Sequence, residues 1–312
     1  MTGMTGTNGM GGTTGTGGGG GAAPGATGPV AETVERPGET RPAARGPVFV
    51  LVSGGYTGGW LWRELVARLR AFGAEAYPVT LTGTGDRRHL GGPETTGATH
   101  VEDLVRFLDH LDEPEVILVG YCYGVYPVLA AAERRLERVA RIVYLDAPMP
   151  LDGYSPLGQA TAMMPDADTR ARMVAQAERA EDGWRVPAPA TLDEWRAAAN
   201  VAGVPDATLE RLHRLASPQP LGALTHPFHL TGAADALPLT GIFCTVGGMI
   251  DTAGLQELVN SGEPAVQRMA GPRAGFFDIA TGHWPMLSTP DELTDVLLRA
   301  AADEGHRLTP AA

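Results

Sequence analysis

Cys122 lies in a setting that favours nucleophilic chemistry. It stands between two glycines in the segment Gly120-Tyr121-Cys122-Tyr123-Gly124. The apolar run Val116 to Val119 before this segment predicts a buried strand, and Val125 to Arg135 after it predicts a helix. A strand, Gly-x-nucleophile-x-Gly and a helix form a sharp turn that exposes the nucleophile. The N-terminus of the helix also favours a thiolate, so we predict that Cys122 is a nucleophile.

His283 is the predicted general base for this nucleophile. It follows the predicted strand Gly275 to Ile279 and precedes the predicted helix Pro290 to Ala302. A nucleophilic thiol is activated by a base within hydrogen-bond reach, and the base is oriented by a third group. His283 comes after Cys122 in chain order and lies in a loop beyond a strand, where such a base is expected.

Two aspartates compete for the role of the third group. Asp251 is the carboxylate in the loop after the predicted strand Ile242 to Val246, and Asp146 ends the predicted strand Arg141 to Leu145. We prefer Asp251, which predicts a Cys-His-Asp triad with Asp146 as the alternative acid.

Backbone N–H groups must stabilise the negative charge that develops on the attacked carbonyl oxygen. Tyr123 supplies one because it directly follows the nucleophile. The loop Ser53 to Gly59, after the predicted strand Val48 to Val52, supplies the other from Gly55 or Tyr56. This loop lacks both Gly-Lys-Ser/Thr and Gly-x-Gly-x-x-Gly, so no nucleotide site is predicted. No metal-ligand spacing is present, and neither a metal nor a cofactor is expected.

The elements that must position these groups alternate between strand and helix. Besides those named, Ala76 to Leu81 predicts a strand, and Trp60 to Phe72 and Val101 to Leu111 predict helices. This order predicts an α/β fold with a mostly parallel central sheet flanked by helices.

Three regions of different composition are predicted along the chain. Residues 1–46 are rich in Gly, Thr and Pro and predict a disordered tail. Residues 47–150 and 236–305 form the α/β core. Residues 151–235 contain helix-like stretches at Asp168 to Glu181, Leu192 to Ala199 and Ala207 to Leu215, without a convincing strand, and predict an inserted helical lid.

Large apolar side chains of the lid and of the site are candidates for binding the substrate. They predict a largely apolar substrate, polyketide-like or aromatic. The candidates are Tyr121, Met163, Met164, Trp184, Trp195 and Trp284.

Composition narrows the classes of partner. The 312 residues carry a net charge of −12, and all 24 basic residues are Arg. An acidic chain without a basic cluster argues against nucleic-acid or membrane partners and leaves a small-molecule substrate, in a monomer or homodimer. Two cysteines do not make a disulfide framework, and neither a signal peptide nor about 18 consecutive apolar residues is present, so a cytoplasmic enzyme is expected.

The chain resembles the α/β-hydrolase superfamily, and within it the salicylate-esterase, methylketone and hydroxynitrile-lyase group. The resemblance runs from Pro47 to about Ala302. It rests on five segments, which are Ser53-Gly54 with Trp60-Leu61-Trp62, Leu81-Thr82-Gly83-Thr84-Gly85-Asp86-Arg87, Thr99-His100-Val101-Glu102-Asp103, Tyr144-Leu145-Asp146-Ala147, and Gly282-His283-Trp284-Pro285-Met286. It implies an α/β-hydrolase fold and esterase-like chemistry.

Four positions depart from that group. Ser53 stands where the group has His, and Cys122 where it has Ser. The usual position of the acid falls near Gly247. Trp284 occupies the place of the Lys that hydroxynitrile lyases use, so cyanohydrin cleavage by that mechanism is not expected.

These residues predict an enzyme that forms a thioester acyl-enzyme from an ester, thioester or lactone of a small apolar metabolite. The alternative is a non-hydrolytic lyase, cyclase or acyltransferase of specialised metabolism, in which His283 acts as acid and base.

Overall fold

The computed structural model describes residues 46–310 except 263 and 268, together with Gly15. The predicted disordered tail therefore lies outside the described residues, apart from Gly15 and Gly46. In the described part of the chain, no helix is both long and apolar enough to cross a membrane.

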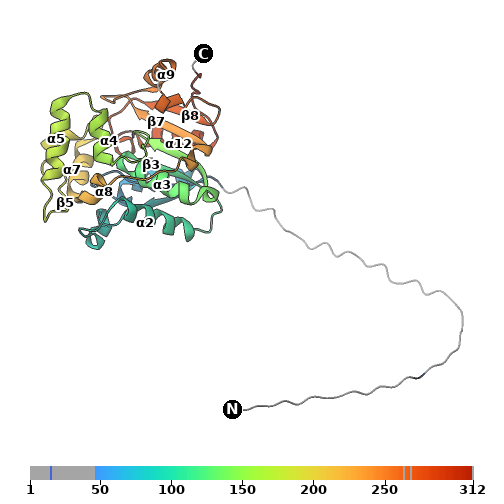
Figure 1. Ribbon diagram of the computed structural model, residues 1–312, viewed down its shortest axis with the longest axis horizontal. Coiled ribbons are helices and arrows are strands. Elements are labelled where there is room, and N and C mark those ends of the chain that lie inside the picture. The colour runs from blue at the N-terminus through green and yellow to red at the C-terminus, as the bar shows by residue number, and fades with distance from the viewer. Residues whose placement is uncertain (1–14, 16–45, 263, 268, 311–312) are drawn as a thin grey trace, which may run out of the picture. The chain divides into compact units, whose positions relative to one another are not determined.

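A parallel sheet of six strands forms the centre of the described chain (Figure 1). Its order is β2-β1-β3-β4-β7-β8, and every neighbouring pair is parallel. The strands are β1 (Val48–Val52), β2 (Glu75–Val79), β3 (Val116–Tyr121), β4 (Val139–Leu145), β7 (Leu239–Cys244) and β8 (Ala274–Ile279). Because the strands are parallel, the loops after β1, β3, β4, β7 and β8 leave from one edge of the sheet.

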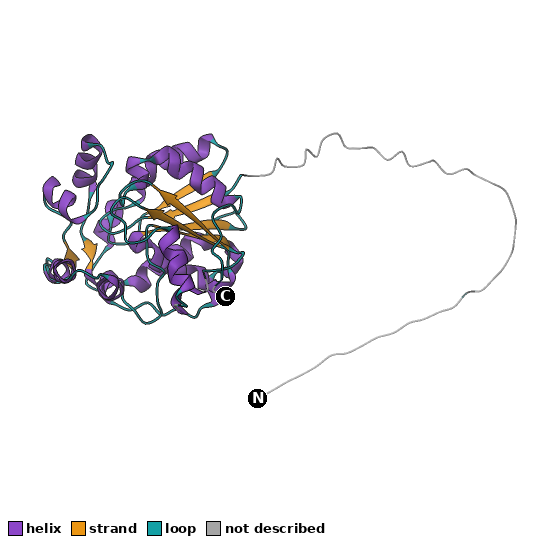
Figure 2. Ribbon diagram, turned by 90° about the horizontal axis from the view of Figure 1, so that it is seen from above, coloured by secondary structure: helices purple, strands orange, loops and turns teal. Residues whose placement is uncertain are grey.

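Helices cover both faces of the sheet (Figure 2). The α-helices of the core are α1 (Arg63–Ala71), α2 (Gly97–Asp109), α3 (Val125–Arg134), α9 (Thr252–Asn260), α10 (Pro264–Gln267), α11 (Pro285–Ser288) and α12 (Pro290–Ala301). Short 3-10 helices are η1 (Gly59–Trp62), η2 (Gly85–Leu90), η3 (Cys122–Gly124), η4 (Leu136–Arg138) and η5 (Ala233–Ala236).

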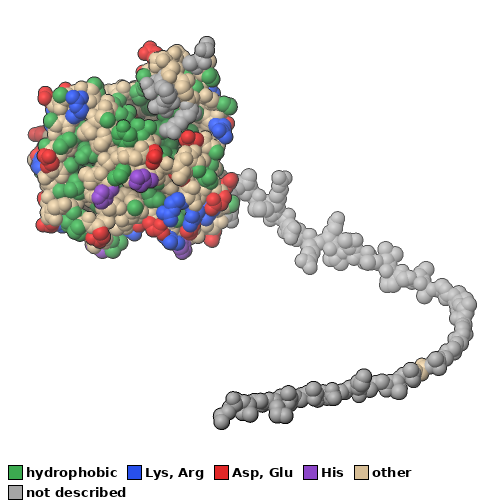
Figure 3. Space-filling model, in the orientation of Figure 1, with side chains coloured by type: hydrophobic (Ala, Val, Ile, Leu, Met, Phe, Trp, Pro, Cys, Tyr) green, Lys and Arg blue, Asp and Glu red, His purple; other side chains and the backbone are tan. Residues whose placement is uncertain are grey.

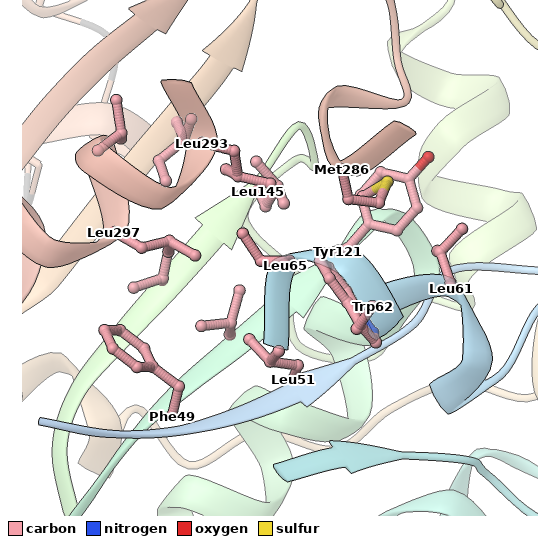
Figure 4. Close-up of a cluster of buried hydrophobic side chains, with 14 of the residues drawn as sticks. Phe49, Leu51, Leu61, Trp62, Leu65, Tyr121, Leu145, Met286, Leu293 and Leu297 are labelled. Carbon is pink, nitrogen blue, oxygen red and sulfur yellow. The ribbon is translucent and has the colours of Figure 1, made fainter. Parts of the chain in front are cut away.

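The alternation of side chains along each strand divides the core between the two faces. Phe49 and Leu51 of β1 pack with Leu65 of α1 and Leu297 of α12 (Figure 4). Val50 and Val52 point the other way and pack with α2 and α3. All four β1 residues are fully buried, and burying such a side chain stabilises the fold by roughly 1.5–3 kcal/mol.

Residues 151–235, which we call the insertion, gather on one side of the sheet in both views (Figures 1 and 2). Its helices are α4 (Pro156–Met163), α5 (Ala167–Glu178), α6 (Leu192–Ala198), α7 (Asp206–Leu215) and α8 (Leu221–Thr225). The sequence missed α4, which begins at a proline and is capped by Ser155, whose side chain accepts from the Gly158 N–H. It also missed the antiparallel pair β5 (Arg185–Val186) and β6 (Gln219–Pro220), because two-residue strands leave no periodic pattern.

The surface over α2 and α3 carries interspersed arginines and acidic residues (Figure 3). Arg106 and Arg134 both pair with Glu102, and Arg135 pairs with Asp109. Exposed pairs of this kind contribute about 0–1 kcal/mol each, so they balance charge locally more than they stabilise the fold.

Candidate active site

Cys122 sits at the sharp turn between β3 and α3. Its φ of 51° lies in the left-handed region, which is strained for a residue with a side chain. A Cβ on Gly120 would lie 2.5 Å from Cα of Val125, and one on Gly124 would lie 2.6 Å from the carbonyl oxygen of Val52. Both glycines are therefore required by close packing, and the turn presents a half-buried thiol.

His283 contacts this thiol. Burial raises the pKa of the Cys122 thiol, but the charge of His283, a hydrogen bond with it and the backbone N–H of Tyr123 outweigh burial and lower the pKa below its ordinary value. Burial lowers the pKa of His283, but the charge of Cys122 and the hydrogen bonds to Asp146 and Cys122 raise it to about 10. Both shifts act in the direction of a thiolate and imidazolium pair.

Asp146 is the carboxylate that holds His283. Its Oδ2 lies 2.5 Å from Nδ1 of His283, and its Oδ1 accepts the backbone N–H of Cys244 at 3.1 Å. Asp146 follows β4 directly, and β4 lies beside β3 in the sheet. Because both strands end at the same edge, the carboxylate comes within reach of the base that faces Cys122.

Our preference for Asp251 as the acid is corrected by the structure. Asp251 is exposed, and its Oδ1 caps α9 by accepting the Gly254 N–H at 2.8 Å. Near Gly247, where the acid was expected from the family resemblance, the chain turns with a φ of 68°. The position of the acid after β7 is thus occupied by a glycine turn, and the carboxylate comes from the end of β4.

The insertion holds the loop that carries His283. The backbone N–H of His283 donates to the carbonyl of Asn200 at 3.0 Å, and the Gly282 N–H donates to the carbonyl of Ala202 at 3.3 Å. The indole N–H of Trp284 donates to the carbonyl of Ala199 at 2.8 Å. These contacts come from one short segment, residues 199–202, which holds the backbone at Gly282 and His283 and the side chain of Trp284.

The loop after β1 passes over Cys122. A Cβ on Gly54 would lie 2.9 Å from the Cβ of Cys122, whereas beside Gly55 there is open space. The Tyr56 N–H is already donated to Oε1 of Gln219 at 3.3 Å. Of the two expected donors in this loop, Gly55 is therefore the better placed for an oxyanion, and the Tyr123 N–H faces the sulfur of Cys122.

Ser53, which replaces a histidine of the related group, is used structurally. Its hydroxyl donates to the carbonyl of Gly58 at 2.8 Å and accepts the indole N–H of Trp62 at 2.9 Å. The side chain is buried, so it closes the turn of the loop and its polar groups are satisfied within the protein.

Three residues in unusual backbone conformations meet at this site. Tyr56, Cys122 and Asp146 have φ values of 65°, 51° and 44°. Each conformation of this kind costs about 1–3 kcal/mol and persists only where neighbouring structure holds it. Such strain gathers at functional sites, which supports the assignment of this region as the active site.

Aromatic residues pack beside the base. Tyr121, which is fully buried, has its ring centroid 5.0 Å from that of His283 and 5.7 Å from that of Trp284. Trp195 of α6 packs 5.7 Å from Trp284 and 6.3 Å from Tyr56. Three of the six substrate-binding candidates thus form one aromatic cluster beside the site.

The other three candidates have different surroundings. Met163 ends α4 and is 47% exposed, and Met164 is the C-cap residue of that helix. Trp184 lies under the guanidinium of Arg185, 5.4 Å from the ring centroid, and near Gly91. In the described structure these three residues therefore interact with the insertion and the end of η2, and these interactions involve neither Cys122 nor His283.

His100 is a supporting residue that sequence reasoning missed. It is fully buried; its Nε2–H donates to the carbonyl of Thr82 at 2.7 Å, and Nδ1 accepts the hydroxyl of Tyr123 at 2.6 Å. Burial lowers the pKa of His100, which keeps it neutral and able to accept. No local signal could reveal this, because the partners are 18 and 23 residues away in the sequence.

A family model described as the alpha/beta hydrolase family matches residues 49–296. The chain belongs to this family. Among the described residues of this α/β-hydrolase, no group of three or more His, Cys, Asp or Glu is placed to hold a metal ion.

Relatives include a carbendazim-hydrolysing esterase of Nocardioides, 39% identical over 34% of this chain and 44% of that protein. A putative chloroplastic methylesterase of Arabidopsis thaliana is 35% identical over 35% of this chain and 31% of that protein. An α-hydroxynitrile lyase of the same plant is 34% identical over 33% of this chain and 40% of that protein. The matched segment thus spans less than half of each of these relatives.

Solved structures share the fold at low identity. A Paenibacillus extracellular α/β-hydrolase superposes with a TM-score of 0.65 at 18% identity, over 81% of this chain and 98% of that one. Polyneuridine aldehyde esterase superposes with a TM-score of 0.61 at 22% identity, over 82% and 99%. These likenesses confirm the α/β-hydrolase fold that the sequence predicts.

Proposed function

We propose that this α/β-hydrolase is an esterase-like enzyme that forms a thioester acyl-enzyme at Cys122 from an ester, thioester or lactone of a small, largely apolar metabolite. The observation that carries the proposal is the contact of Cys122 with His283, whose Nδ1 is 2.5 Å from Asp146. A thiolate at a strained turn, a base beside it and an orienting carboxylate are the parts of a nucleophilic acyl-transfer site.

In the first step, the Cys122 thiolate attacks the carbonyl carbon and the carbonyl oxygen becomes an oxyanion. The N–H groups of Tyr123 and Gly55 stabilise that charge. Asp146 holds Nδ1 of His283, which leaves Nε2 toward the thiol. The imidazolium then donates its Nε2 proton to the leaving group, and the thioester remains on Cys122.

In the second step, neutral His283 takes a proton from a water molecule, and the hydroxide attacks the thioester carbonyl. The tetrahedral intermediate collapses, the acid leaves and Cys122 departs as the thiolate beside the imidazolium. Each proton is thus returned, and no cofactor enters the balance.

The names of the relatives support ester chemistry, since they include a carbendazim-hydrolysing esterase and methylesterases. The cluster of Tyr121, Trp195 and Trp284 beside His283 supports an apolar or aromatic substrate. We therefore extend the esterase class to this chain.

Intact-mass spectrometry with p-nitrophenyl acetate tests the proposal. We expect one acetyl group on the wild-type protein, none on Cys122→Ala, and release of acetic acid with p-nitrophenolate. Cys122→Ala that turns over the ester at the wild-type rate would contradict covalent catalysis at this residue. Acetyl transfer to an added alcohol without acetic acid would instead identify an acyltransferase.

A further inference from the structure

Tyr56, next to the oxyanion donor Gly55, is held by the insertion. Its N–H donates to Oε1 of Gln219 at 3.3 Å, and its carbonyl accepts the Ser217 N–H at 2.9 Å. Its ring packs edge-on against Trp195, and its phenol hydrogen bonds with Gln176. Three separate parts of the insertion, in α5, in α6 and around β6, therefore converge on one residue of the loop.

The conformation of Tyr56 makes this support necessary. Tyrosine at a φ of 65° is strained by about 1–3 kcal/mol, and a conformation of this kind persists only where the surrounding structure holds it. Rotation at Tyr56 turns the peptide unit that joins it to Gly55 and thereby displaces the Cα of Gly55. The Gly55 N–H lies one peptide unit further back and shifts with that Cα, so its position depends on the contacts that hold Tyr56.

The two residues that hydrogen bond with the backbone of Tyr56 are buried between the insertion and the loop after β1. Gln219 and Ser217 are each only 1% exposed, so water does not replace the hydrogen bonds that they make. Ser217 is anchored in turn, since its hydroxyl accepts the Gly85 N–H at 2.7 Å. The Nε2 atom of Gln219 has no partner within the described structure, so the contact with Tyr56 is the hydrogen bond that this side chain makes.

We propose that Gln219 is a positioning residue that sets the oxyanion loop, so that acylation of Cys122 depends on the insertion. This inference rests on the proposed function. Gln219 acts through Tyr56 and Gly55. The loop of His283 is held by other residues of the insertion, 199–202, so the pairing of Cys122 with His283 does not require Gln219.

Two reactions of Cys122 separate positioning from structural damage. Iodoacetamide alkylates the thiolate by displacing iodide, which requires no oxyanion hole. p-Nitrophenyl acetate acetylates the same sulfur through an oxyanion and releases p-nitrophenolate. Both reactions need the thiolate, so the ratio of the two rates reports what acetylation needs beyond it, the oxyanion loop included.

The test compares Gln219→Met with Gln159→Met. Methionine keeps the length and volume of the side chain and removes the amide. Gln159 is the matched control, because it is also 1% exposed, belongs to the insertion and makes hydrogen bonds to Leu151 and Met149 and none to Tyr56. Loss of one oxyanion donor costs about 100- to 1,000-fold, so a displaced donor should slow acetylation about 10- to 100-fold.

We expect Gln219→Met to alkylate at the wild-type rate and to acetylate 10- to 100-fold more slowly, with Gln159→Met unchanged in the ratio of the rates. Equal acetylation by Gln219→Met and wild type would overturn the inference. A parallel fall in both rates would also overturn it, since it would mean that Gln219 supports the thiolate. Failure of the wild-type protein to acetylate at Cys122 would refute the proposed function itself, and it is seen before any variant is made.

Discussion

Replacing Asp146 and Asp251 separately by Asn tests which carboxylate serves His283. Asp146 has a φ of 44°, a conformation that Asn tolerates well, so the substitution removes the charge with little strain. Asp251 is an exposed N-cap, where Asn is as effective as Asp. The two substitutions therefore make the same chemical change with little strain, and they differ because only Asp146 contacts His283.

The expected loss follows from that contact. Oδ2 of Asp146 accepts from Nδ1 of His283 at 2.5 Å and stabilises the imidazolium. A hydrogen bond to a charged group contributes roughly 1.5–3 kcal/mol. Since about 1.4 kcal/mol is a factor of ten, Asp146→Asn should lower kcat/KM about 10- to 150-fold. Asp251→Asn should leave kcat/KM within about twofold of the wild type, because a surface change away from such contacts has little effect.

Steady-state hydrolysis of p-nitrophenyl acetate measures both values, and the thiolate absorbance of Cys122 reports the ion pair at each pH. In Asp146→Asn, the pKa of His283 should fall from about 10, and the high-pH limit of activity should move down with it. Unchanged activity in Asp146→Asn together with a large loss in Asp251→Asn would refute the assignment of the acid.

Three further predictions concern the site and its support. Acylation should fall as the pH rises through about 10, where His283 loses the proton that it gives to the leaving group; a rate that keeps rising beyond this pH would contradict the ion pair. The pair should also stabilise the fold within a limited window. Because its pKa is raised, His283 adds to the free energy of unfolding fully below its ordinary pKa, and this contribution is lost as the pH rises through about 10. Because its pKa is lowered, Cys122 adds to the free energy of unfolding fully above its ordinary pKa, and this contribution is lost as the pH falls through the folded-state value. His100→Leu should lower the free energy of unfolding by roughly 1–3 kcal/mol, because it leaves the buried hydroxyl of Tyr123 without its acceptor. Urea unfolding measures this, and the double variant with Tyr123→Phe should cost less than the sum of the single changes; simple additivity would show that the two side chains do not act together.

The order of strands and helices could be predicted from the sequence because each element has a local pattern. The run Val48 to Val52 is a strand with those bounds, and the predicted helix beginning at Pro290 begins there in the structure. The sharp turn at Cys122 could also be predicted, since it is marked by two glycines that close packing requires. These features depend on neighbours in the sequence, and the sequence alone therefore determined them.

The partners of each reactive group were decided by tertiary structure. Asp146 and Asp251 both follow strands that end at one edge of the sheet, and no local pattern tells which loop turns toward His283. The support of Tyr56 by Gln219 joins residues 163 positions apart. The sequence by itself determined the fold, the sharp turn that holds Cys122 and the end of the sheet at which chemistry is expected. Only the packing of the loops and the insertion decided which acid and which N–H groups face Cys122, because distances of a few ångströms between remote segments are set by the folded chain as a whole.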